Sequence, residues 1–329
     1  MQEKKRILSG MRPTGKLHLG HYCGALQNWV RLQKEYHCFY IIADWHALTT
    51  DYERIGPVRE YTLDMVIDML AAGIDPEKSV LFIQSEVKQH AELALLLGML
   101  TPLSWLERVS TYKEQMQQLT GRDLSTFGFL GYPLLQAADI MIYKAHTVPV
   151  GIDQQPHIEL TREIARRFNF FYGEVFPEPE CLLAEESKIL GLDNRKMSKS
   201  YDNAIFLSDT PDIIRKKVGT MITDPARIKR SDPGHPEVCN VFTFHKIFSP
   251  PEVVEEVKCK CEHAEIGCVE DKKKMAEYLI TAIAPHQSRR AELAKNPAQV
   301  REILEKGKQK ATEFAEKTMD EVRHAMKLK

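Results

Sequence analysis

The chain has 329 residues, of which 43% are hydrophobic and 28% are charged, and its formal net charge is −1. This is the composition of an ordinary soluble globular protein with enough residues for two domains, and it gives no sign of a globally basic nucleic-acid binder. No window approaches 18 uncharged apolar residues, and the N-terminus leads into no signal-peptide core, so we expect a cytoplasmic protein without a membrane segment.

Residues 1–160 alternate strand and helix patterns. Short apolar runs predict strands at Arg6–Leu8, Phe39–Asp44, Val80–Ile83 and Thr147–Val150. Apolar residues at helical spacing predict helices at Leu19–Leu32, Val58–Leu70 and Gly131–Tyr143. Apolar strands that alternate with helices are typical of a doubly wound parallel sheet, in which ligands bind at the carboxyl ends of the strands.

After about residue 205 the strand pattern ends. Residues 270–329 are rich in Ala, Glu, Lys and Leu at helical spacing, interrupted at Pro285 and Pro297. We therefore predict an α/β protein with a Rossmann-like catalytic domain over residues 1–205 and a mainly helical domain over residues 206–329.

The first strand is followed by Gly10-Met11-Arg12-Pro13-Thr14-Gly15-Lys16-Leu17-His18-Leu19-Gly20-His21. A strand, a loop of small residues and a helix N-terminus form an anion site, because free backbone N–H groups point into the loop. Gly20 lets a flat group approach the backbone, and His18 and His21 lie on one helical face, where they can donate to phosphate oxygens. Taken alone, the stretch also fits a βα turn with two solvated histidines.

A second polar stretch, Lys196-Met197-Ser198-Lys199-Ser200, follows Gly191-Leu192-Asp193-Asn194 and has no apolar periodicity. It is predicted to be a mobile loop. Two ammonium groups can reach a chain of phosphates, and two serine hydroxyls can hydrogen-bond its oxygens. An ordinary polar surface loop is the alternative for this stretch alone.

Together and in this order, the two stretches resemble the HIGH and KMSKS signatures of the class I aminoacyl-tRNA synthetases. Within that class, the chain resembles the bacterial tryptophanyl-tRNA synthetases from Arg6 almost to its last residue. The segments that carry this resemblance are Asp44–Ala47, Tyr132–Ile140, Val148–Gln154 and Thr223–Arg227.

The resemblance implies activation of L-tryptophan with ATP, followed by transfer to tRNA(Trp). Catalysis would fall to Lys196, Lys199, His18 and His21. The implied ATP contacts are Arg12, Thr14, Gly20, His21, Gly151, Asp153, Lys196, Met197, Ser198 and Lys199. Mg²⁺ is expected to accompany ATP, held mostly by phosphate oxygens. Arg12 stands where many bacterial relatives have Gln, and a cation there could contact a phosphate or a carboxylate.

The implied tryptophan site consists of Leu8, His46, Tyr132, Gln136, Asp139, Val148, Val150 and Gln154. Asp139 would accept the indole N–H, the one polar group on the side chain of tryptophan. Val148 and Val150 would form branched walls for the ring, and Tyr132 and Gln154 would hold the ammonium or carboxylate group. A helix residue that faces solvent is the alternative for Asp139, although its neighbours are apolar.

The seven cysteines are an odd number in an expected cytoplasmic chain, which disfavours disulfides. By the resemblance, Cys239, Cys261 and Cys268 match three ligands of a [4Fe–4S] cluster that some bacterial relatives carry. The fourth position is Asp271, and Cys259 is an additional thiol. Zinc held by cysteines with Asp271 or His263 is one alternative, and a remnant without metal is the other.

The resemblance also implies a homodimer and an anticodon surface on the helical domain, where local positive charge comes from Arg289, Arg290, Arg301, Lys306, Lys308 and Lys310. Functions from other classes, and one from within the class, compete with this one. A small-substrate nucleotidyltransferase would not need residues 206–329. An iron–sulfur electron carrier or an RNA-binding regulator would not need paired signatures. Tyrosyl-tRNA synthetase is the nearest competitor within the class.

Overall fold

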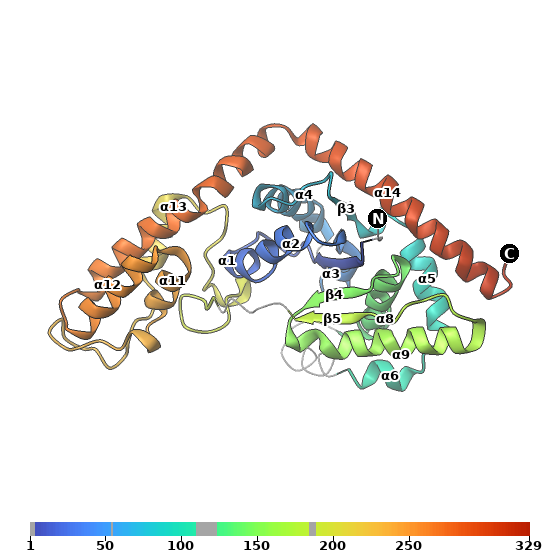
Figure 1. The fold of residues 1–329 in the computed structure, drawn as a ribbon, viewed down its shortest axis with the longest axis horizontal. Coiled ribbons are helices and arrows are strands. Elements are labelled where there is room, and N and C mark those ends of the chain that lie inside the picture. Colours follow the sequence, from blue (N-terminus) through green and yellow to red (C-terminus); the bar gives the residue numbers. More distant parts are fainter. Residues whose placement is uncertain (1–3, 54, 110–123, 184–188) are drawn as a thin grey trace. The chain divides into compact units, whose positions relative to one another are not determined.

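The computed structural model describes residues 4–53, 55–109, 124–183 and 189–329 (Figure 1). The chain forms two compact units. The sheet unit comprises residues 1–15, 28–185 and 296–329, and the helical unit comprises residues 16–27 and 186–295. The sequence-based boundary at residues 205 and 206 falls inside the helical unit. None of the described helices is both long and apolar enough to cross a lipid bilayer.

A five-stranded parallel sheet forms the centre of the sheet unit. Its strands are β1 (Arg6–Met11), β2 (His37–Ile42), β3 (Ser79–Ile83), β4 (Thr147–Val150) and β5 (Glu180–Leu183), in the order β3-β2-β1-β4-β5. All neighbouring strands are parallel, with Leu8 opposite Phe39 and Val148 opposite Cys181. The predicted doubly wound sheet is therefore confirmed. The sequence analysis missed β5, a half-exposed edge strand with a weak apolar pattern.

Helices surround this sheet. They are α2 (Gln27–Leu32), α3 (Asp44–Asp51), α4 (Ile55–Ala72), α5 (Gln89–Gly98), α6 (Leu103–Glu107), α8 (Phe127–Ile142), α9 (Gln155–Tyr172) and α14 (Pro297–Ala325). Helix α8 begins four residues before the predicted Gly131, because the side chain of Thr126 accepts a hydrogen bond from the Phe129 N–H at 3.2 Å and caps the helix.

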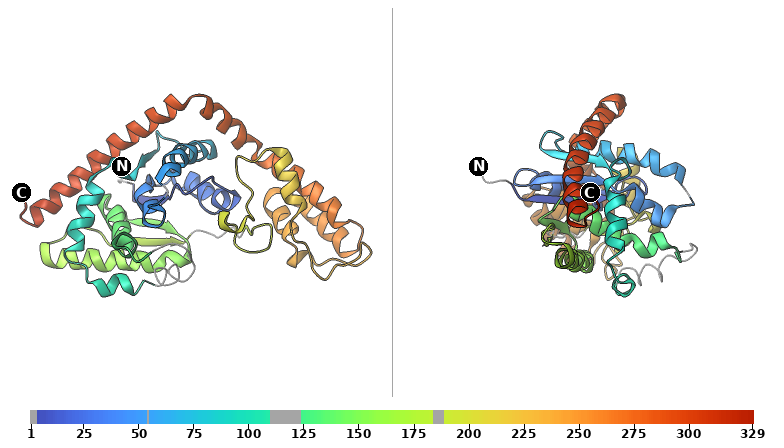
Figure 2. Two further views of the ribbon diagram at one scale, coloured as in Figure 1. Left: turned by 180° about the vertical axis from the view of Figure 1, so that it is seen from behind. Right: turned by 90° about the vertical axis from the view of Figure 1, so that its right-hand side faces the viewer.

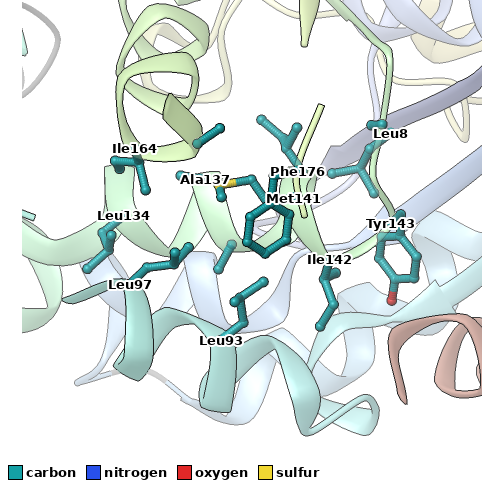
Figure 3. Close-up of a cluster of buried hydrophobic side chains, with 14 of the residues drawn as sticks. Leu8, Leu93, Leu97, Leu134, Ala137, Met141, Ile142, Tyr143, Ile164 and Phe176 are labelled. Carbon is teal, nitrogen blue, oxygen red and sulfur yellow. The ribbon is translucent and has the colours of Figure 1, made fainter. Parts of the chain in front are cut away.

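An apolar cluster of the sheet unit gathers around α8. Figure 3 shows Ala137 and Met141 of α8 facing Leu93 and Leu97 of α5. Leu93, Leu97 and Ala137 are fully buried. This packing fixes the face of α8 that carries Asp139, because a helix buried on several sides cannot rotate without opening cavities.

Helix α14 lies against β3, the edge strand (Figure 2). Gly307 makes this close approach possible. A Cβ atom at position 307 would overlap the carbonyl oxygen of Leu81 in β3, so only glycine fits here. The last helix of the chain is therefore part of the sheet unit.

In its described residues, the helical unit contains helices of very different lengths and isolated bridges but no strand of the sheet. Its elements are α1 (Leu19–His21), the π-helical η1 (Tyr22–Leu26), η4 (Lys199–Tyr201), α10 (Pro211–Gly219), η5 (Pro236–Val238), α11 (Asn240–Phe248), α12 (Pro251–Glu262) and α13 (Cys268–Lys295). The single helix predicted over residues 19–32 is thus three segments, and the middle one is a π-turn of the kind often found at functional sites.

The predicted interruption at Pro285 is wrong. Helix α13 continues through Pro285 from Cys268 to Lys295. Proline removes one helical hydrogen bond, but Met275, Leu279 and Ile283 are fully buried along α13 and hold the helix by packing. The predicted break at Pro297 is confirmed, since α14 begins there after Asn296, whose side chain accepts from the Gln299 N–H.

Candidate active site

The two signature stretches meet within the helical unit. The backbone N–H of Leu19 donates to the carbonyl of Ile205 at 3.0 Å, and the N–H of Leu207 donates to the carbonyl of Leu17 at 3.0 Å. His18 and Phe206 form an isolated antiparallel bridge between these two bonds. The segment that follows Lys196–Ser200 is thus paired with the backbone of the histidine motif.

Gly20 lies at the contact between the signatures. A Cβ atom added at Gly20 would lie 3.0 Å from the His18 ring and 3.6 Å from Cβ of Met197. The rings of His18 and His21 are packed together, with centroids 3.7 Å apart. The N–H of His18 donates to Nδ1 of His21 at 3.2 Å, which fixes the orientation of the second ring.

Both histidines are held neutral. Burial and, to a smaller extent, the positive charge of Lys199 lower the pKa of His18 to about 4. The pKa of His21 lies well below its usual range because of burial, His18, Lys199 and Lys196, in that order. Near neutral pH the two imidazoles therefore act as uncharged hydrogen-bonding groups beside two ammonium groups.

The side chain of Asn203, which is 2% exposed, holds the backbone of the second signature by hydrogen bonds. Its side-chain oxygen accepts from the Ser198 N–H at 2.8 Å, and its amide donates to Asp193 at 2.7 Å and to the Lys196 carbonyl at 3.2 Å. Gly191 makes room for this amide, because a Cβ atom at position 191 would overlap it. The stretch predicted as a loop thus has a fixed backbone from Lys196 to Ser198.

Four of the predicted ATP residues belong to the sheet unit. Arg12 and Thr14 directly follow β1, and Gly151 and Asp153 directly follow β4. Because β1 and β4 are neighbouring parallel strands, all four residues follow the carboxyl ends of strands on the same side of the sheet. A Cβ atom at Gly151 would lie 2.7 Å from the Asp153 carboxylate, so Gly151 leaves that carboxylate its place.

Asp139 is the centre of a buried polar network. Its Oδ2 atom lies 2.8 Å from Nε2 of His46, and its Oδ1 atom lies 2.6 Å from Nδ1 of His90. The amide of Gln84 donates to both carboxylate oxygens at 2.9 and 2.8 Å. Nε2 of His90 lies 2.8 Å from the hydroxyl of Tyr143, which extends the network.

The carboxyl group of Asp139 is held ionised. Burial by itself raises its pKa, but hydrogen bonds from His46 and His90 and their positive charge outweigh burial and hold the pKa at about 2. An ionised carboxylate has about four acceptor positions, and the four contacts from His46, His90 and Gln84 use them. The alternative of an Asp139 side chain in solvent is wrong, since the residue is 3% exposed.

The other predicted tryptophan residues also belong to the sheet unit. Leu8 and Val148 are buried in the apolar cluster, and Val150 packs against it. Tyr132 and Gln136 are half-buried on α8, and the Tyr132 ring lies 5.4 Å from that of His157, centroid to centroid. The amide of Gln154 donates to Asp153 at 2.9 Å.

The sequence analysis missed three residues of these networks, namely Gln84, His90 and Asn203. Gln84 opens η2 (Gln84–Glu86) directly after β3, at the strand edge where ligands bind in this fold class. That position was a usable signal. His90 and Asn203 gave none, because each acts through partners that lie more than four residues away along the chain.

Two of the three predicted cysteine ligands lie against an arginine. Nη1 of Arg227 lies 3.7 Å from Sγ of Cys261 and 3.9 Å from Sγ of Cys268. Nη2 of Arg227 donates to the carbonyl of Ile266 at 2.8 Å. Burial raises the pKa values of Cys239 and Cys261, which favours thiols over the thiolates that a cluster requires.

The fourth ligand position is also engaged. The Asp271 carboxylate lies 3.2 Å from Nε2 of His245, and Cys259 is exposed beside His263. In the part of the chain that the structure describes, no group of three or more His, Cys, Asp or Glu side chains converges on a common point where a metal ion could bind. This arrangement does not fit the [4Fe–4S] cluster or the zinc site, two of the alternatives that the sequence left open.

Comparisons with known proteins agree with this geometry. A family model for class I tRNA synthetases (W and Y) matches residues 1–284. The tryptophan–tRNA ligase of Thermotoga maritima is 55% identical, covering 98% of this chain and 99% of the relative. That of Aquifex aeolicus is 46% identical, covering 98% of this chain and 100% of the relative. Tryptophanyl-tRNA synthetase from Campylobacter jejuni, complexed with ADP and tryptophan, has a TM-score of 0.89 at 34% identity, covering 98% of this chain and 99% of that one. The chain therefore belongs to the class I tRNA synthetases for tryptophan and tyrosine, among the bacterial tryptophanyl-tRNA synthetases.

Proposed function

We propose that this chain is an ATP-dependent tryptophan–tRNA ligase, which activates L-tryptophan and transfers it to tRNA(Trp). The observation that carries the proposal is the meeting of the two signatures, with Met197 against Gly20 and the Lys199 charge acting on His18. The relatives at 55% and 46% identity are tryptophan–tRNA ligases, and the match covers 99% and 100% of their lengths. This supports tryptophan as the amino acid.

In the first step, a carboxylate oxygen of tryptophan attacks the α-phosphorus of ATP. The bond from that phosphorus to the bridging oxygen breaks, and pyrophosphate leaves with the electron pair. Lys196 and Lys199 stabilise the negative charge that grows on the leaving group, and the neutral rings of His18 and His21 donate hydrogen bonds to phosphate oxygens. Such chemistry needs positioning and charge stabilisation rather than a covalent intermediate on the protein.

In the second step, a ribose hydroxyl at the 3′ end of tRNA attacks the carbonyl carbon of the adenylate. The hydroxyl proton is lost, the ester forms and AMP leaves. Arg12, Thr14, Gly151 and Asp153 are assigned to nucleotide binding, because the carboxyl ends of β1 and β4 are where a doubly wound sheet binds ligands.

Asp139 is assigned to the recognition of tryptophan. Its carboxylate is ionised, and its acceptor positions are occupied by His46, His90 and Gln84. The indole N–H of tryptophan would bind Asp139 by replacing one of these three donors. His46 is the donor assigned to move aside, as it is the only one of the three whose side chain is partly exposed. Leu8, Val148 and Val150 supply apolar walls, and Tyr132, Gln136 and Gln154 supply polar groups for the amino and carboxyl groups. A site built around such a bond discriminates against analogues that lack the N–H, in favourable cases by about 10⁴-fold.

Mg²⁺ is proposed to enter with ATP. Phosphate oxygens and water would hold the ion, because Mg²⁺ usually keeps several waters and binds through the phosphates of its substrate. A cytoplasmic location and a homodimer are proposed as well, on family membership alone.

ATP–pyrophosphate exchange tests this function. The purified chain should catalyse exchange with tryptophan and not with tyrosine, and it should charge tRNA(Trp). Exchange that tyrosine supports and tryptophan does not would overturn the assignment while leaving the family intact.

A further inference from the structure

A pocket of about 650 Å³ opens between α10 and α13 in the helical unit. Its lining includes five basic side chains and one acidic one, namely Arg215, Lys216, Lys272, Lys273, Lys274 and Glu277. The whole chain has a formal net charge of −1, so this pocket is a local concentration of positive charge. None of its residues belongs to the two signatures or to the Asp139 network.

Two of the five cations are neutralised in place. Arg215 forms a two-pronged ion pair with Glu277, with N–O distances of 2.7 and 3.1 Å. Lys274 pairs with Glu256 at 2.9 Å. The other three basic residues of the lining, Lys216, Lys272 and Lys273, lie outside these pairs.

Those three lysines have no carboxylate partner in the described part of the chain. Nζ of Lys272 donates to the Gly219 carbonyl at 3.3 Å, which turns it toward the end of α10. Lys216 and Lys273 are exposed. Unneutralised ammonium groups from two facing helices attract an extended anion rather than a single carboxylate.

The pocket is not purely polar. Val269 lies one helical turn before Lys272 and Lys273 on α13 and is 69% exposed. Together with Ala276, it gives the pocket an apolar side between the lysines. Phosphates beside a flat, weakly polar base or sugar match this combination, and a free inorganic anion does not use the apolar side.

The basic residues on α14 differ from these. Lys306 pairs with Glu302 at 2.8 Å and Lys308 pairs with Glu305 at 3.2 Å. A paired lysine must give up its carboxylate before it can bind a phosphate, which weakens its net contribution. The sequence-based tRNA surface therefore includes lysines that are already engaged.

We propose that the α10–α13 pocket binds the phosphodiester backbone of tRNA through Lys216, Lys272 and Lys273. The inference rests on the proposed function, because that function makes tRNA the polyanion that the chain must hold. Contacts of this kind position the nucleic acid without reading its sequence.

The test compares two triple variants with equal loss of charge. The pocket variant carries Lys216→Gln, Lys272→Gln and Lys273→Gln. The control carries Lys78→Gln, Lys306→Gln and Lys308→Gln, three lysines that are paired with carboxylates. Binding of a tRNA(Trp) transcript is measured at several salt concentrations, together with aminoacylation and ATP–pyrophosphate exchange.

In the pocket variant, the plot of log K for tRNA binding against log salt should become less steep by about 2 to 3. Each lost phosphate contact reduces the magnitude of this slope by about 0.7 to 0.9. The KM of this variant for tRNA should rise at least about tenfold, while exchange stays unchanged. The control should change the slope by less than about one. An equal change in both variants, or a larger one in the control, would overturn the proposal.

Two further measurements keep the result interpretable. The double variant Lys216→Gln, Lys273→Gln omits Lys272, which contacts the end of α10, and should lower the slope by about 1.5 without altering thermal unfolding. An unchanged slope in this correctly folded variant would also overturn the proposal. Absence of tryptophan-dependent exchange in the unmodified chain would count against the proposed function, not against the pocket.

Discussion

The side-chain amide of Asn203 donates a hydrogen bond to the carboxylate of Asp193 at 2.7 Å, which joins the residues on either side of the second signature, Lys196–Ser200. The same side chain accepts from the Ser198 N–H at 2.8 Å. Asn203 is thus the point from which the backbone between Lys196 and Ser198 is held, and it contacts no reacting group itself. Its role is to position the lysines through their backbone.

Replacement of Asn203 by Ala should therefore slow adenylate formation without weakening tryptophan binding. The change removes the Asn203 acceptor of the Ser198 N–H at a partly buried site, which costs about 1–3 kcal/mol, or roughly 5- to 150-fold if it is felt in the transition state. Single-turnover kinetics and equilibrium tryptophan binding separate the two effects. A fall in tryptophan affinity with an unchanged chemical step would contradict this role.

Lys199→Ala should slow adenylate formation as well, because its partner, the charge on pyrophosphate, develops fully only in the transition state. Tryptophan binding should stay near normal. The same variant should raise the pKa of His18 from about 4, since one of the two causes of its depression is removed.

The His18 pKa in this variant should nevertheless stay below 6.5, because burial is the larger cause. Titration of the imidazole by NMR gives this value directly. A His18 pKa that does not respond to Lys199→Ala would show that the two side chains are not coupled. Slower adenylate formation in this variant could then not be explained by the proximity of Lys199 to His18.

Asp139→Asn tests the recognition of tryptophan with little change of volume. Loss of the anionic acceptor should lower kcat/KM for tryptophan by roughly 5- to 150-fold and affect the KM for ATP much less. Gln136→Ala, on the same helix and half-buried, is the matched comparison and should have a smaller effect. Equal losses for both substrates would make Asp139 a structural residue only.

The depressed pKa of Asp139 also predicts a pH dependence of stability. Its value of about 2, against the usual 3.8, means that the ionised form stabilises the fold above about pH 4 and that this contribution is lost as the pH falls through about 2. The difference corresponds to about 2 kcal/mol. Asparagine does not ionise, so the gap in unfolding free energy between the protein and Asp139→Asn should shrink from pH 6 to pH 2 in urea titrations. A constant gap would contradict the assignment.

The cysteine region predicts an outcome for iron. Asp271→Cys supplies a fourth thiol and frees the position from its contact with His245, so anaerobic reconstitution should raise the iron content above that of the unmodified chain. We expect the unmodified chain to hold well under four irons, because Arg227 lies against two of the thiols. Iron analysis and the visible spectrum measure both. Four irons in the unmodified chain would show that Arg227 moves aside.

Much of the fold could be predicted from short-range patterns. The four predicted strands are present because their apolar runs are long enough to be buried on both faces, as in β2, where Cys38 to Ile42 are all buried. The pattern failed at β5, an edge strand, and at Pro285, where tertiary packing overrides a local helix breaker. The π-helical segment Tyr22–Leu26 has no periodicity of its own to reveal it.

The residues of the candidate site likewise include some that the sequence could predict and some that it could not. His18, Gly20 and Met197 could be found because the two motifs are compact in sequence, and the structure brings them into contact. The supporting residues could not, because Asn203 and His90 become significant only through distant partners. The cysteine spacing suggested a metal centre, but spacing cannot show that Arg227 lies against the thiols.

The position of α14 has a consequence for biosynthesis. Gly307 brings this helix against β3, so a helix that is translated after all five strands covers the open edge of the sheet. An emerging chain on the ribosome therefore carries an uncovered strand edge until α14 has left the exit tunnel. Such an edge can pair with another nascent chain, so chains truncated before α14 are the ones most exposed to misassembly.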